Sequence, residues 1–240
     1  MRLDKFLALE GRCTRSGAKE QLRRGRVTVN GAVARDGAQA VDPEKDTIAL
    51  DGETLRYRSE MHLMLNKPAG VLTAANDPRC RTVMDLLPRA CAAMGCMPVG
   101  RLDLDTEGLL LFTTDGQLAH RLLAPKRGVQ KVYVAEVDGI LTEEDAAAFA
   151  RGLQLSDFLA RSARLEILPP GDTGRVTVCE GKYHQVKRMF GARGRKVTHL
   201  KRLTFGGIAL DEALAPGEWR ELTKAERDAL YAAAEGNEND

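Results

Sequence analysis

The segment GRLDLDTEGLLLFTTDG, from Gly100 to Gly116, places three aspartates and a glutamate beside an apolar run. Carboxylates at alternate positions can bind a metal ion, or one of them can act alone as a nucleophile or a base. These two chemistries predict different classes of protein, so the spacing has to be compared with each of them.

The run DLDTEG, which begins at Asp103, resembles the first half of an EF-hand calcium loop. That loop needs a bidentate glutamate at its twelfth position, where this chain has Thr114. The flanking residues are also typical of strands, whereas an EF-hand loop joins two helices. The D-x-D-x-T loop of aspartyl phosphotransfer fails as well, because Thr106 stands in the fourth place and not the fifth. We therefore expect no metal at this segment.

A single reactive carboxylate fits the segment better, because Asp103 would lie in a turn between two strands. Loops at the ends of strands on a rigid sheet commonly carry reactive groups. If the segment is extended, the alternation of side chains places Arg101 and Asp105 on the same side as Asp103. The alternative is structural, with the acids capping the turn and pairing with Arg101. The residue types alone leave both interpretations open.

The composition is that of a globular protein. The chain has 240 residues, of which 43% are hydrophobic and 29% charged, which suits one or two domains. No apolar run approaches the roughly 20 residues of a membrane span, and the charged N-terminus is unlike a secretory signal. The five scattered cysteines form no CxxC pair. A disulfide or zinc framework is therefore not expected, and a reducing cytoplasm fits best.

The charge is distributed unevenly along the chain, although the formal net charge is only +2. Residues 1–35 carry nine Lys or Arg against three acids, and residues 181–210 carry eight and no acid. Residues 36–60 and the last thirty residues are acidic. Solvated surface charge would be a sufficient explanation for one basic segment. Two such segments favour a polyanionic partner held at two places.

The first fifty residues predict a small module of two helices followed by short strands. Apolar residues repeat at helical spacing over residues 3–11, and a second helix begins at Thr14 or Ser16 and ends near Arg24. Alternating valines precede a hairpin-turn pair, NG, at residues 30–31, and the segment DTIALDGE supplies another strand.

The rest of the chain predicts an α+β domain with a mixed, largely antiparallel sheet flanked by helices, because strands and helices occur without regular βαβ alternation. We expect boundaries at residues 1–58 for the N-terminal α/β module, 59–234 for the larger domain and 235–240 for a flexible tail. A charged joint at residues 54–60 would let the two domains reorient. The predicted strands are Met97–Arg101, Leu109–Thr113, Lys131–Val137, Ala163–Ile167, Arg175–Val178 and Lys196–Arg202. The predicted helices are Gln117–Leu123, Glu143–Arg151, His184–Arg193 and Lys224–Ala234.

Four blocks of this sequence resemble the RNA pseudouridine synthases, and most closely the branch that modifies ribosomal RNA. They are MLNKPAGVLTA, GRLDLDTEGLLLFTTDGQLAHRLLAPKRGVQKVYVAEV, EGKYHQVKRMFGARGRKVTHLKRLTFGGIAL and LAPGEWRELT. The N-terminal runs MRLDKFLA and SGAKEQLRRGRVTVNG resemble the S4-like RNA-binding domain, whose second helix and following turn lie against structured RNA. The resemblance covers residues 1 to about 231 in one continuous order.

This resemblance implies that the protein isomerises uridine to pseudouridine without a cofactor, and that Asp103 is the essential catalytic group. Asp103 would attack the sugar or the base, or remove a sugar proton, and the sequence does not choose between these routes. Tyr133 matches the tyrosine that stacks on the target base and aids proton transfer. Lys187 matches the basic residue that pairs with the catalytic aspartate. By spacing alone, Tyr133 could equally be a core aromatic and Lys187 a solvated helix lysine.

The resemblance also implies a set of RNA contacts. His184 and Gln185 would orient their helix or touch RNA, and we assign no histidine a catalytic role. Arg101 would support the substrate strand or fill the gap left by the target base. The basic residues expected to meet phosphates are Arg2, Lys5, Arg15, Lys19, Arg23, Arg24 and Arg26 in the N-terminal module, and Lys126, Arg127, Lys131 and Arg188 near the cleft.

The expected partner is ribosomal RNA, 16S in preference to 23S, in an assembly intermediate, with the protein acting as a monomer and away from membranes. The target uridine has to leave its stack to reach Asp103, which costs a few kcal/mol. Two alternatives stay open. One is a sister enzyme that acts on 23S rRNA, and the other is a noncatalytic RNA-binding factor in ribosome assembly.

Overall fold

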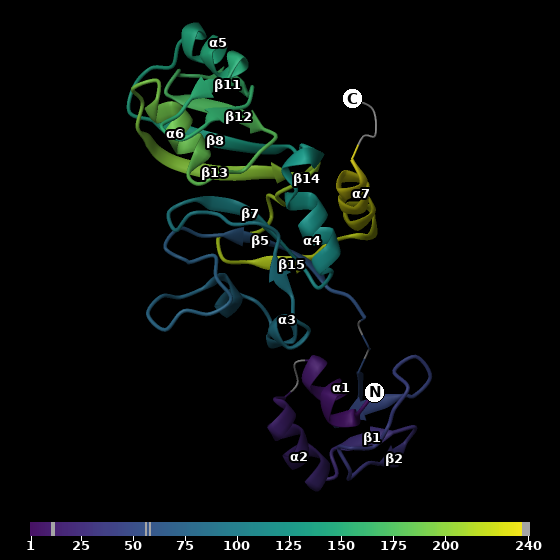
Figure 1. Cartoon of the computed structure of the whole chain (residues 1–240). Coiled ribbons are helices and arrows are strands. Elements are labelled where there is room, and N and C mark those ends of the chain that lie inside the picture. Colours follow the sequence, from purple (N-terminus) through teal and green to yellow (C-terminus); the bar gives the residue numbers. More distant parts are fainter. Residues whose placement is uncertain (11–12, 56, 58, 237–240) are drawn as a thin grey trace. The chain divides into compact units, whose positions relative to one another are not determined.

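The computed structural model describes residues 1–10, 13–55, 57 and 59–236, and its chain divides into two compact units (Figure 1). The N-terminal unit contains Met1–Met61 with Leu87–Cys96, and the C-terminal unit contains His62–Leu86 and the chain from Met97 onward. The predicted boundary at residues 58 and 59 stays a prediction. Residues 56 and 58 of the predicted joint, and residues 237–240 of the predicted tail, lie outside the described residues.

The N-terminal unit packs two helices against a small antiparallel sheet with the strand order β2-β1-β3-β4. The Thr14 hydroxyl accepts a hydrogen bond from the Gly17 backbone N–H at 3.0 Å, so the predicted cap does begin the second helix. Leu3, Phe6 and Leu7 are buried together with Leu22. The elements are α1 (Leu3–Leu9), α2 (Arg15–Arg23), β1 (Val27–Val29), β2 (Ala32–Val33), β3 (Ile48–Leu50), β4 (Glu53–Leu55) and the short helix α3 (Arg89–Ala93).

The C-terminal unit is built on one mixed sheet of nine strands in the described residues. The main strand order is β11-β12-β8-β13-β7-β5-β15, with β14 beside β13 and β6 beside β7. All of these pairs are antiparallel except β13 with β7. The strands are β5 (His62–Lys67), β6 (Met97–Pro98), β7 (Glu107–Thr113), β8 (Lys131–Val137), β11 (Arg164–Leu168), β12 (Thr173–Val178), β13 (Val197–Phe205), β14 (Ile208–Ala209) and β15 (Trp219–Glu221), with β9 (Leu153–Gln154) and β10 (Leu159–Ala160) forming a separate pair.

The helices lie near the two halves of this sheet. Figure 1 shows α4 and α7 beside β7 and β14, and α5 and α6 beside β8, β11 and β12. Asp115 caps α4 through the Gln117 and Leu118 N–H groups, and its other oxygen accepts from the Tyr231 hydroxyl of α7 at 3.1 Å. The helices are α4 (Gly116–Leu123), α5 (Glu143–Arg151), α6 (Gln185–Gly191) and α7 (Lys224–Glu235), with short 3-10 turns at Val83–Leu86 and Pro125–Arg127.

The predicted mixed, largely antiparallel architecture is confirmed, and α5 and β8 have the predicted bounds. The predicted strand Met97–Arg101 is wrong beyond Pro98, because the chain leaves the sheet there and enters a loop that reaches Thr106. Among the described residues, no helix combines the length and apolar character needed to cross a membrane.

Gly108 makes the one parallel pairing of the main sheet possible. Its φ is +96°, and a Cβ atom placed on it would lie 2.2 Å from the Arg202 carbonyl oxygen. Only glycine tolerates both this backbone conformation and so close an approach of a neighbouring strand. Gly108 thus brings β7 directly against β13, and the two strands place the residues before Glu107 and the side chain of Arg202 in one region.

Candidate active site

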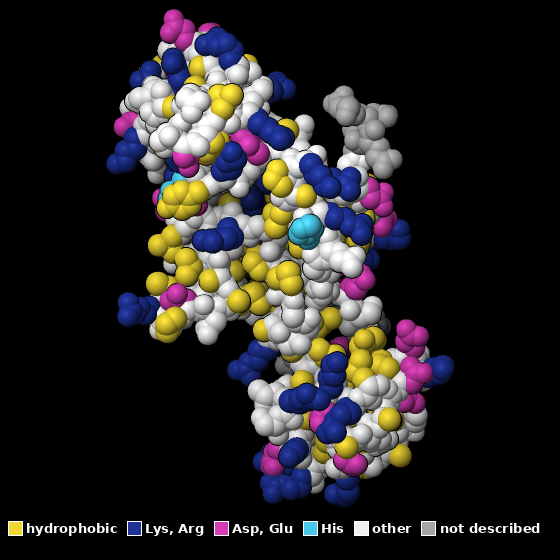
Figure 2. Space-filling model, viewed as in Figure 1, with side chains coloured by type: hydrophobic (Ala, Val, Ile, Leu, Met, Phe, Trp, Pro, Cys, Tyr) yellow, Lys and Arg dark blue, Asp and Glu magenta, His cyan; other side chains and the backbone are white. Residues whose placement is uncertain are grey.

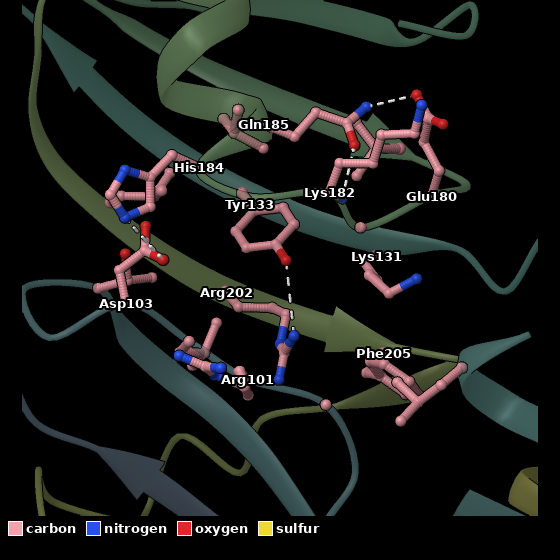
Figure 3. Close-up of a pocket in the computed structure, with 18 residues that line it drawn as sticks. Arg101, Asp103, Lys131, Tyr133, Glu180, Lys182, His184, Gln185, Arg202 and Phe205 are labelled. Atoms are coloured by element: carbon pink, nitrogen blue, oxygen red, sulfur yellow. Dashed lines mark hydrogen bonds and ion pairs between the residues drawn. The ribbon is translucent and has the colours of Figure 1, made fainter. Parts of the chain in front are cut away.

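A cavity of about 130 Å³ opens in the C-terminal unit between β8, β13 and two loops (Figure 3). One wall is the Asp103 loop, residues 101–106, and the opposite wall is the segment from Glu180 to Val186. Side chains from β8 and β13 form the base of the cavity. The cavity therefore gathers residues from five separate parts of the sequence, of which the Asp103 loop is one.

Lys67 binds the backbone of the Asp103 loop through its ammonium group. It ends β5 fully buried, and its Nζ donates to the carbonyl oxygens of Asp103 at 3.0 Å, Leu104 at 3.3 Å and Thr106 at 2.8 Å. It also donates to the Pro68 carbonyl at 3.0 Å. Burial lowers the pKa of Lys67 to about 8. One ammonium group thus ties together the turn that presents Asp103.

Thr73 supports the other end of the same loop. Its hydroxyl donates to the Leu102 carbonyl at 2.8 Å and accepts from the Leu102 N–H at 3.3 Å. Both residues are buried, so water does not compete for these bonds. With Lys67, these contacts fix the backbone on both sides of the Asp103 side chain.

Asp103 lies between two basic side chains. Its carboxylate is 3.2 Å from Lys187 Nζ and 3.4 Å from His184 Nε2, and 27% of its side chain is exposed. Lys187 also contacts Asp105 at 2.5 Å, and this hydrogen bond lowers the pKa of Asp105. The structure thus brings Asp103 and Lys187 together as the sequence resemblance implied.

Asp103 and Asp105 both contact Lys187, although the segment does not have the extended form from which a common direction was predicted. The segment is not extended, because Leu104 and Asp105 form a turn. Asp105 is largely exposed, with 74% of its side chain accessible. The structural alternative predicted that Arg101 pairs with these acids. Among the described residues, Asp103 and Asp105 instead form ion pairs with Lys187 and His184.

His184 contacts the Asp103 carboxylate, a contact that sequence reasoning missed. It precedes α6 with φ +49°, the left-handed region that few non-glycine residues adopt. Its ring stacks on the exposed ring of Tyr183 with centroids 3.8 Å apart. Its neighbour Gln185 is turned inward, accepting from the Lys182 N–H at 3.0 Å and donating to Glu180 at 2.6 Å.

Tyr133 and Arg202 face each other across β8 and β13. They are paired in register, and Arg202 Nη1 lies 3.5 Å from the Tyr133 hydroxyl oxygen. A bulge after Arg202 shifts the next pairing, so Phe205, rather than Thr204, lines the cavity. Tyr133 is buried, and its ring forms part of the cavity, as a residue that stacks on a bound base must.

Lys131 was expected to meet a phosphate near the cleft, and the structure places it in the cavity wall, while its contact with a phosphate stays a prediction. The side chain is only 7% exposed, lines the cavity and donates to the Val129 carbonyl at 3.0 Å. It begins β8 two residues before Tyr133, and side chains two apart on a strand share a face. Burial, reinforced by the positive charge of Arg202, lowers its pKa to about 8.

Of the other residues of the C-terminal unit predicted to contact RNA, one lines the cavity and three do not. Arg101 lines the cavity, whereas Lys126, Arg127 and Arg188 are not among its lining residues. Arg127 donates to the Glu235 carbonyl, and Arg188 pairs with Asp157. Their contact with RNA stays a prediction.

The predicted cations of the N-terminal unit are exposed, and Figure 2 shows Lys and Arg side chains spread over this unit with acids between them. Five of them form ion pairs with acids: Arg2 and Arg15 with Asp4, Arg23 and Arg24 with Glu20, and Arg26 with Asp51. Lys5 and Lys19 are exposed as well. Charge that is already paired with acids at the surface contributes less to the field felt by a polyanion.

Lys67 and Arg202 are two charged site residues that the sequence did not single out. In the sequence, Lys67 is part of a turn-like KP pair, and Arg202 is one of eight cations in a basic segment. Lys67 ends a strand that is buried throughout, and Arg202 lies two residues after the buried Leu200 on β13, and these positions are the signal that could have marked them. Within the described residues, no group of three or more His, Cys, Asp or Glu side chains gathers to hold a metal ion.

Comparison with known proteins gives two family matches. Residues 61–192 match the model of the RNA pseudouridylate synthase family, and residues 1–48 match the S4 domain. The chain is 45% identical to an RNA pseudouridine synthase of Bacillus subtilis strain 168, covering 94% of this chain and 96% of the relative. It is 42% identical to ribosomal small subunit pseudouridine synthase A of Escherichia coli K12, covering 94% and 98%.

A solved structure shares the fold over nearly the whole chain. It is a crystal structure of a pseudouridylate synthase with a TM-score of 0.67 and 38% sequence identity, covering 96% of this chain and 99% of that one. Both the order of the two units and the sheet that carries the cavity therefore have a counterpart in a known structure.

Proposed function

Because this chain belongs to the RNA pseudouridine synthase family and begins with an S4 domain, we propose that it converts one uridine of 16S rRNA to pseudouridine, using Asp103 as the reacting carboxylate. The observation that carries this proposal is the position of Asp103. Its carboxylate lies at the wall of a cavity, on a loop fixed by Lys67 and beside the cation of Lys187.

The cavity suits one nucleobase. An engineered cavity of about 150 Å³ in another protein binds benzene, so a volume of about 130 Å³ fits a single six-membered ring. A uridine inside folded RNA reaches it only after leaving its stack. The ring of Tyr133 would then pack on the base and keep it beside Asp103.

The chemistry uses the Asp103 carboxylate, one oxygen of which lies 3.2 Å from Lys187 Nζ. Asp103 then attacks the sugar or the base, or takes a sugar proton, and all three routes need a free oxygen lone pair. The uracil is detached from the ribose, turned over and rejoined through carbon. No oxidant or cofactor is required, because uridine and pseudouridine are isomers.

The S4 domain would hold the RNA while the cavity selects the base. Its exposed cations on α1, α2 and the following turn would meet phosphates, a contact that carries affinity but no sequence information. We choose 16S rRNA as the substrate because the chain is 42% identical to the small-subunit pseudouridine synthase of Escherichia coli, over 98% of the length of that relative. We propose further that the protein acts as a monomer on an assembly intermediate.

Release of tritium from RNA labelled at C5 of uridine tests the activity, because the new carbon–carbon bond expels that hydrogen. Asp103→Asn should abolish release while RNA affinity stays within about threefold of the wild type. Asp105→Asn is a matched control, because Asp105 contacts the same Lys187 but is largely exposed, and it should keep most of the activity.

Substrate choice is tested with the same assay on 16S and 23S transcripts and on their partly assembled particles. Release from 16S substrates alone supports the proposal, and release from 23S substrates alone assigns the protein to the sister activity. No release from either RNA by the folded wild type would contradict the catalytic proposal and favour a binding factor.

A further inference from the structure

The cavity has a second charged end, away from Asp103. In Figure 3, Asp103 and His184 lie on one side of Tyr133, and Lys131 and Phe205 lie on the other, with the guanidinium of Arg202 between Arg101 and Lys131 in this view. We call Lys131 and Arg202 the cationic end of the cavity. Both residues line it, and they come from the neighbouring strands β8 and β13.

Arg202 is buried with an unused donor. Its exposed fraction is 2%, and its Nε donates to the Leu109 carbonyl at 2.8 Å. Its Nη2 has no hydrogen-bond partner among the described residues. The Thr106 hydroxyl, which also lines the cavity, is likewise buried and without such a partner in the same part of the chain. A buried donor left unpaired is unfavourable, and ligand sites are a common reason for one.

The cationic end has little compensating negative charge. Glu180 is the acid that lines the cavity there, and its Oε1 already accepts from the Arg161 N–H at 2.8 Å and from Gln185 Nε2 at 2.6 Å. The repulsion from Arg202 and the burial of Lys131 both disfavour the charged ammonium. Two neighbouring buried cations are unfavourable unless an anion joins them, so the cavity is set to stabilise negative charge.

We propose that Lys131 and Arg202 stabilise the negative charge that the uracil base acquires when its bond to the ribose breaks. This inference rests on the proposed function. It assigns the two residues to direct contact with the detached base, whereas Asp103 at the other end reacts with the nucleotide itself.

The electron count is the same for each route open to Asp103. The C1′–N1 bond breaks and its electron pair stays on the base. C1′ then bonds to an Asp103 oxygen, or forms a C1′–C2′ double bond as Asp103 takes the C2′ proton. Where Asp103 has instead added to C6 of the base, the same pair leaves with the base and C1′ becomes an oxocarbenium ion. After the base turns, C5 bonds to C1′ as the C1′–Asp103 bond breaks, as C2′ regains its proton from Asp103, or by direct attack on the oxocarbenium ion, according to the route. C5 then loses its proton, N1 gains one, and an Asp103 oxygen bonded to C6 leaves with the electrons of that bond.

The base carries negative charge over its nitrogen and carbonyl oxygens until C5 has bonded. Arg202 is fixed by the Leu109 carbonyl and Lys131 by the Val129 carbonyl, so neither has to reorganise when the charge develops. Fixed charges in a water-excluded site are the arrangement that most strongly stabilises a charged intermediate. Because the charge is spread over the ring atoms, some part of the charged ring faces the two fixed cations in each orientation that the base adopts while it turns.

Single-turnover tritium release at saturating protein tests the assignment. Lys131→Met removes the charge and keeps the length of the side chain, and it should lower the rate constant by about 10²–10³-fold, as the loss of one preorganised donor does elsewhere. The dissociation constant for the RNA should stay within about threefold. Lys224→Met, which removes an exposed lysine of α7 outside the cavity wall, should leave the rate unchanged.

The pH profile supplies a second readout that a structural role would not change. Arg202 faces Lys131 from β13, and Cys179 and Glu180 face it from the segment after β12. Lys131 loses its proton as the pH rises through about 8, so the wild-type rate should fall above that pH. Lys131→Arg keeps its charge, so its rate should be maintained to a higher pH than the wild type.

The outcomes separate this inference from the proposed function. No tritium release by the wild type would contradict the proposed function itself. An active wild type with a Lys131→Met rate within about threefold of its own would overturn the inference. So would a variant that changes only RNA affinity and its salt dependence, because Lys131 would then contact a phosphate. If Lys131→Met does not fold, identical profiles for the wild type and Lys131→Arg overturn it.

Discussion

Two regions of the C-terminal unit bury a lysine, and they do so for different reasons. Lys67, below the Asp103 loop, donates to four carbonyl oxygens within 3.3 Å. Lys131, at the cationic end, donates one hydrogen bond among the described residues, to the Val129 carbonyl, and has Arg202 as a charged neighbour. Burial lowers the pKa of both to about 8. The comparison teaches that a shifted pKa does not separate a structural lysine from a ligand-binding one, whereas the partners do.

The largest expected effect on stability comes from a substitution of Lys67. Lys67→Met removes the donor to four backbone carbonyls, and we expect the free energy of unfolding to fall by about 3 kcal/mol. The rate should fall with it, because the Asp103 loop loses its support. Urea denaturation and tritium release measure the two effects.

Lys131→Met is the matched control for that stability loss, because it removes a buried charge with one recorded bond. We expect its unfolding free energy to change by less than about 1 kcal/mol, since removing a poorly compensated buried cation relieves repulsion. Equal losses of stability in the two variants would remove the distinction between the regions.

The pH dependence of stability should be alike in the two regions, which sharpens the comparison. Each lysine has a folded-state pKa of about 8, below its ordinary value of 10.5, so the unfolded chain binds more protons between these values. The free energy of unfolding should therefore rise with pH in this window, by on the order of 2 kcal/mol for each lysine.

Either Met variant should weaken this rise in denaturation experiments between pH 8 and 10.5, relative to the wild type. The rate of the wild type should fall over the same window. A variant that leaves the pH dependence of stability unchanged would show that its lysine is not titrating there.

A smaller effect is expected at the second support of the loop. Thr73→Val removes the hydroxyl that bonds to both backbone groups of Leu102, and we expect a loss of about 1 kcal/mol of stability. The rate should fall less than in Lys67→Met, because Lys67 still holds the turn. Thr54→Val, at an exposed position of β4, is the control and should change neither quantity. A rate as low as that of Lys67→Met would contradict the ranking of the two supports.

The smallest expected effect on stability is at an exposed lysine of the N-terminal unit. Lys19→Met should change the free energy of unfolding by less than about 0.5 kcal/mol. If Lys19 contacts a phosphate, RNA binding should weaken a few-fold and the salt dependence of the affinity should fall by about one ion. Binding isotherms at several salt concentrations measure this, and an unchanged salt slope would contradict the contact.

The sequence predicted what depends on local pattern. Alternating and helical periodicity give β8 and α5 their bounds, and the hydroxyl of Thr14 begins α2. Family motifs identify Asp103 and Lys187, which lie 3.2 Å apart although they are far apart in the sequence.

Contacts between distant strands could not be read in the same way. Lys131 was grouped with its basic neighbours because nothing local shows that Phe205 lies across from it on β13 or that the charge of Arg202 acts on it. Lys67 has four acceptors on residues up to 39 positions away, and His184 meets Asp103 through the loop before α6. Burial and pairing at these positions are set by the sheet order, which periodicity does not determine.

That sheet order also bears on how the protein is made. β13 lies between β7 and β8, and β15, near the end of the chain, pairs with β5 at its beginning in this unit. Such distant pairings slow folding, because the entropy of closing a long loop is lost before the strand contacts form and compensate for it. While the ribosome is still synthesising the later strands, β7 and β8 have exposed edges. The cavity forms only when β13 has joined them, so the nascent chain needs protection from aggregation before it can act on RNA.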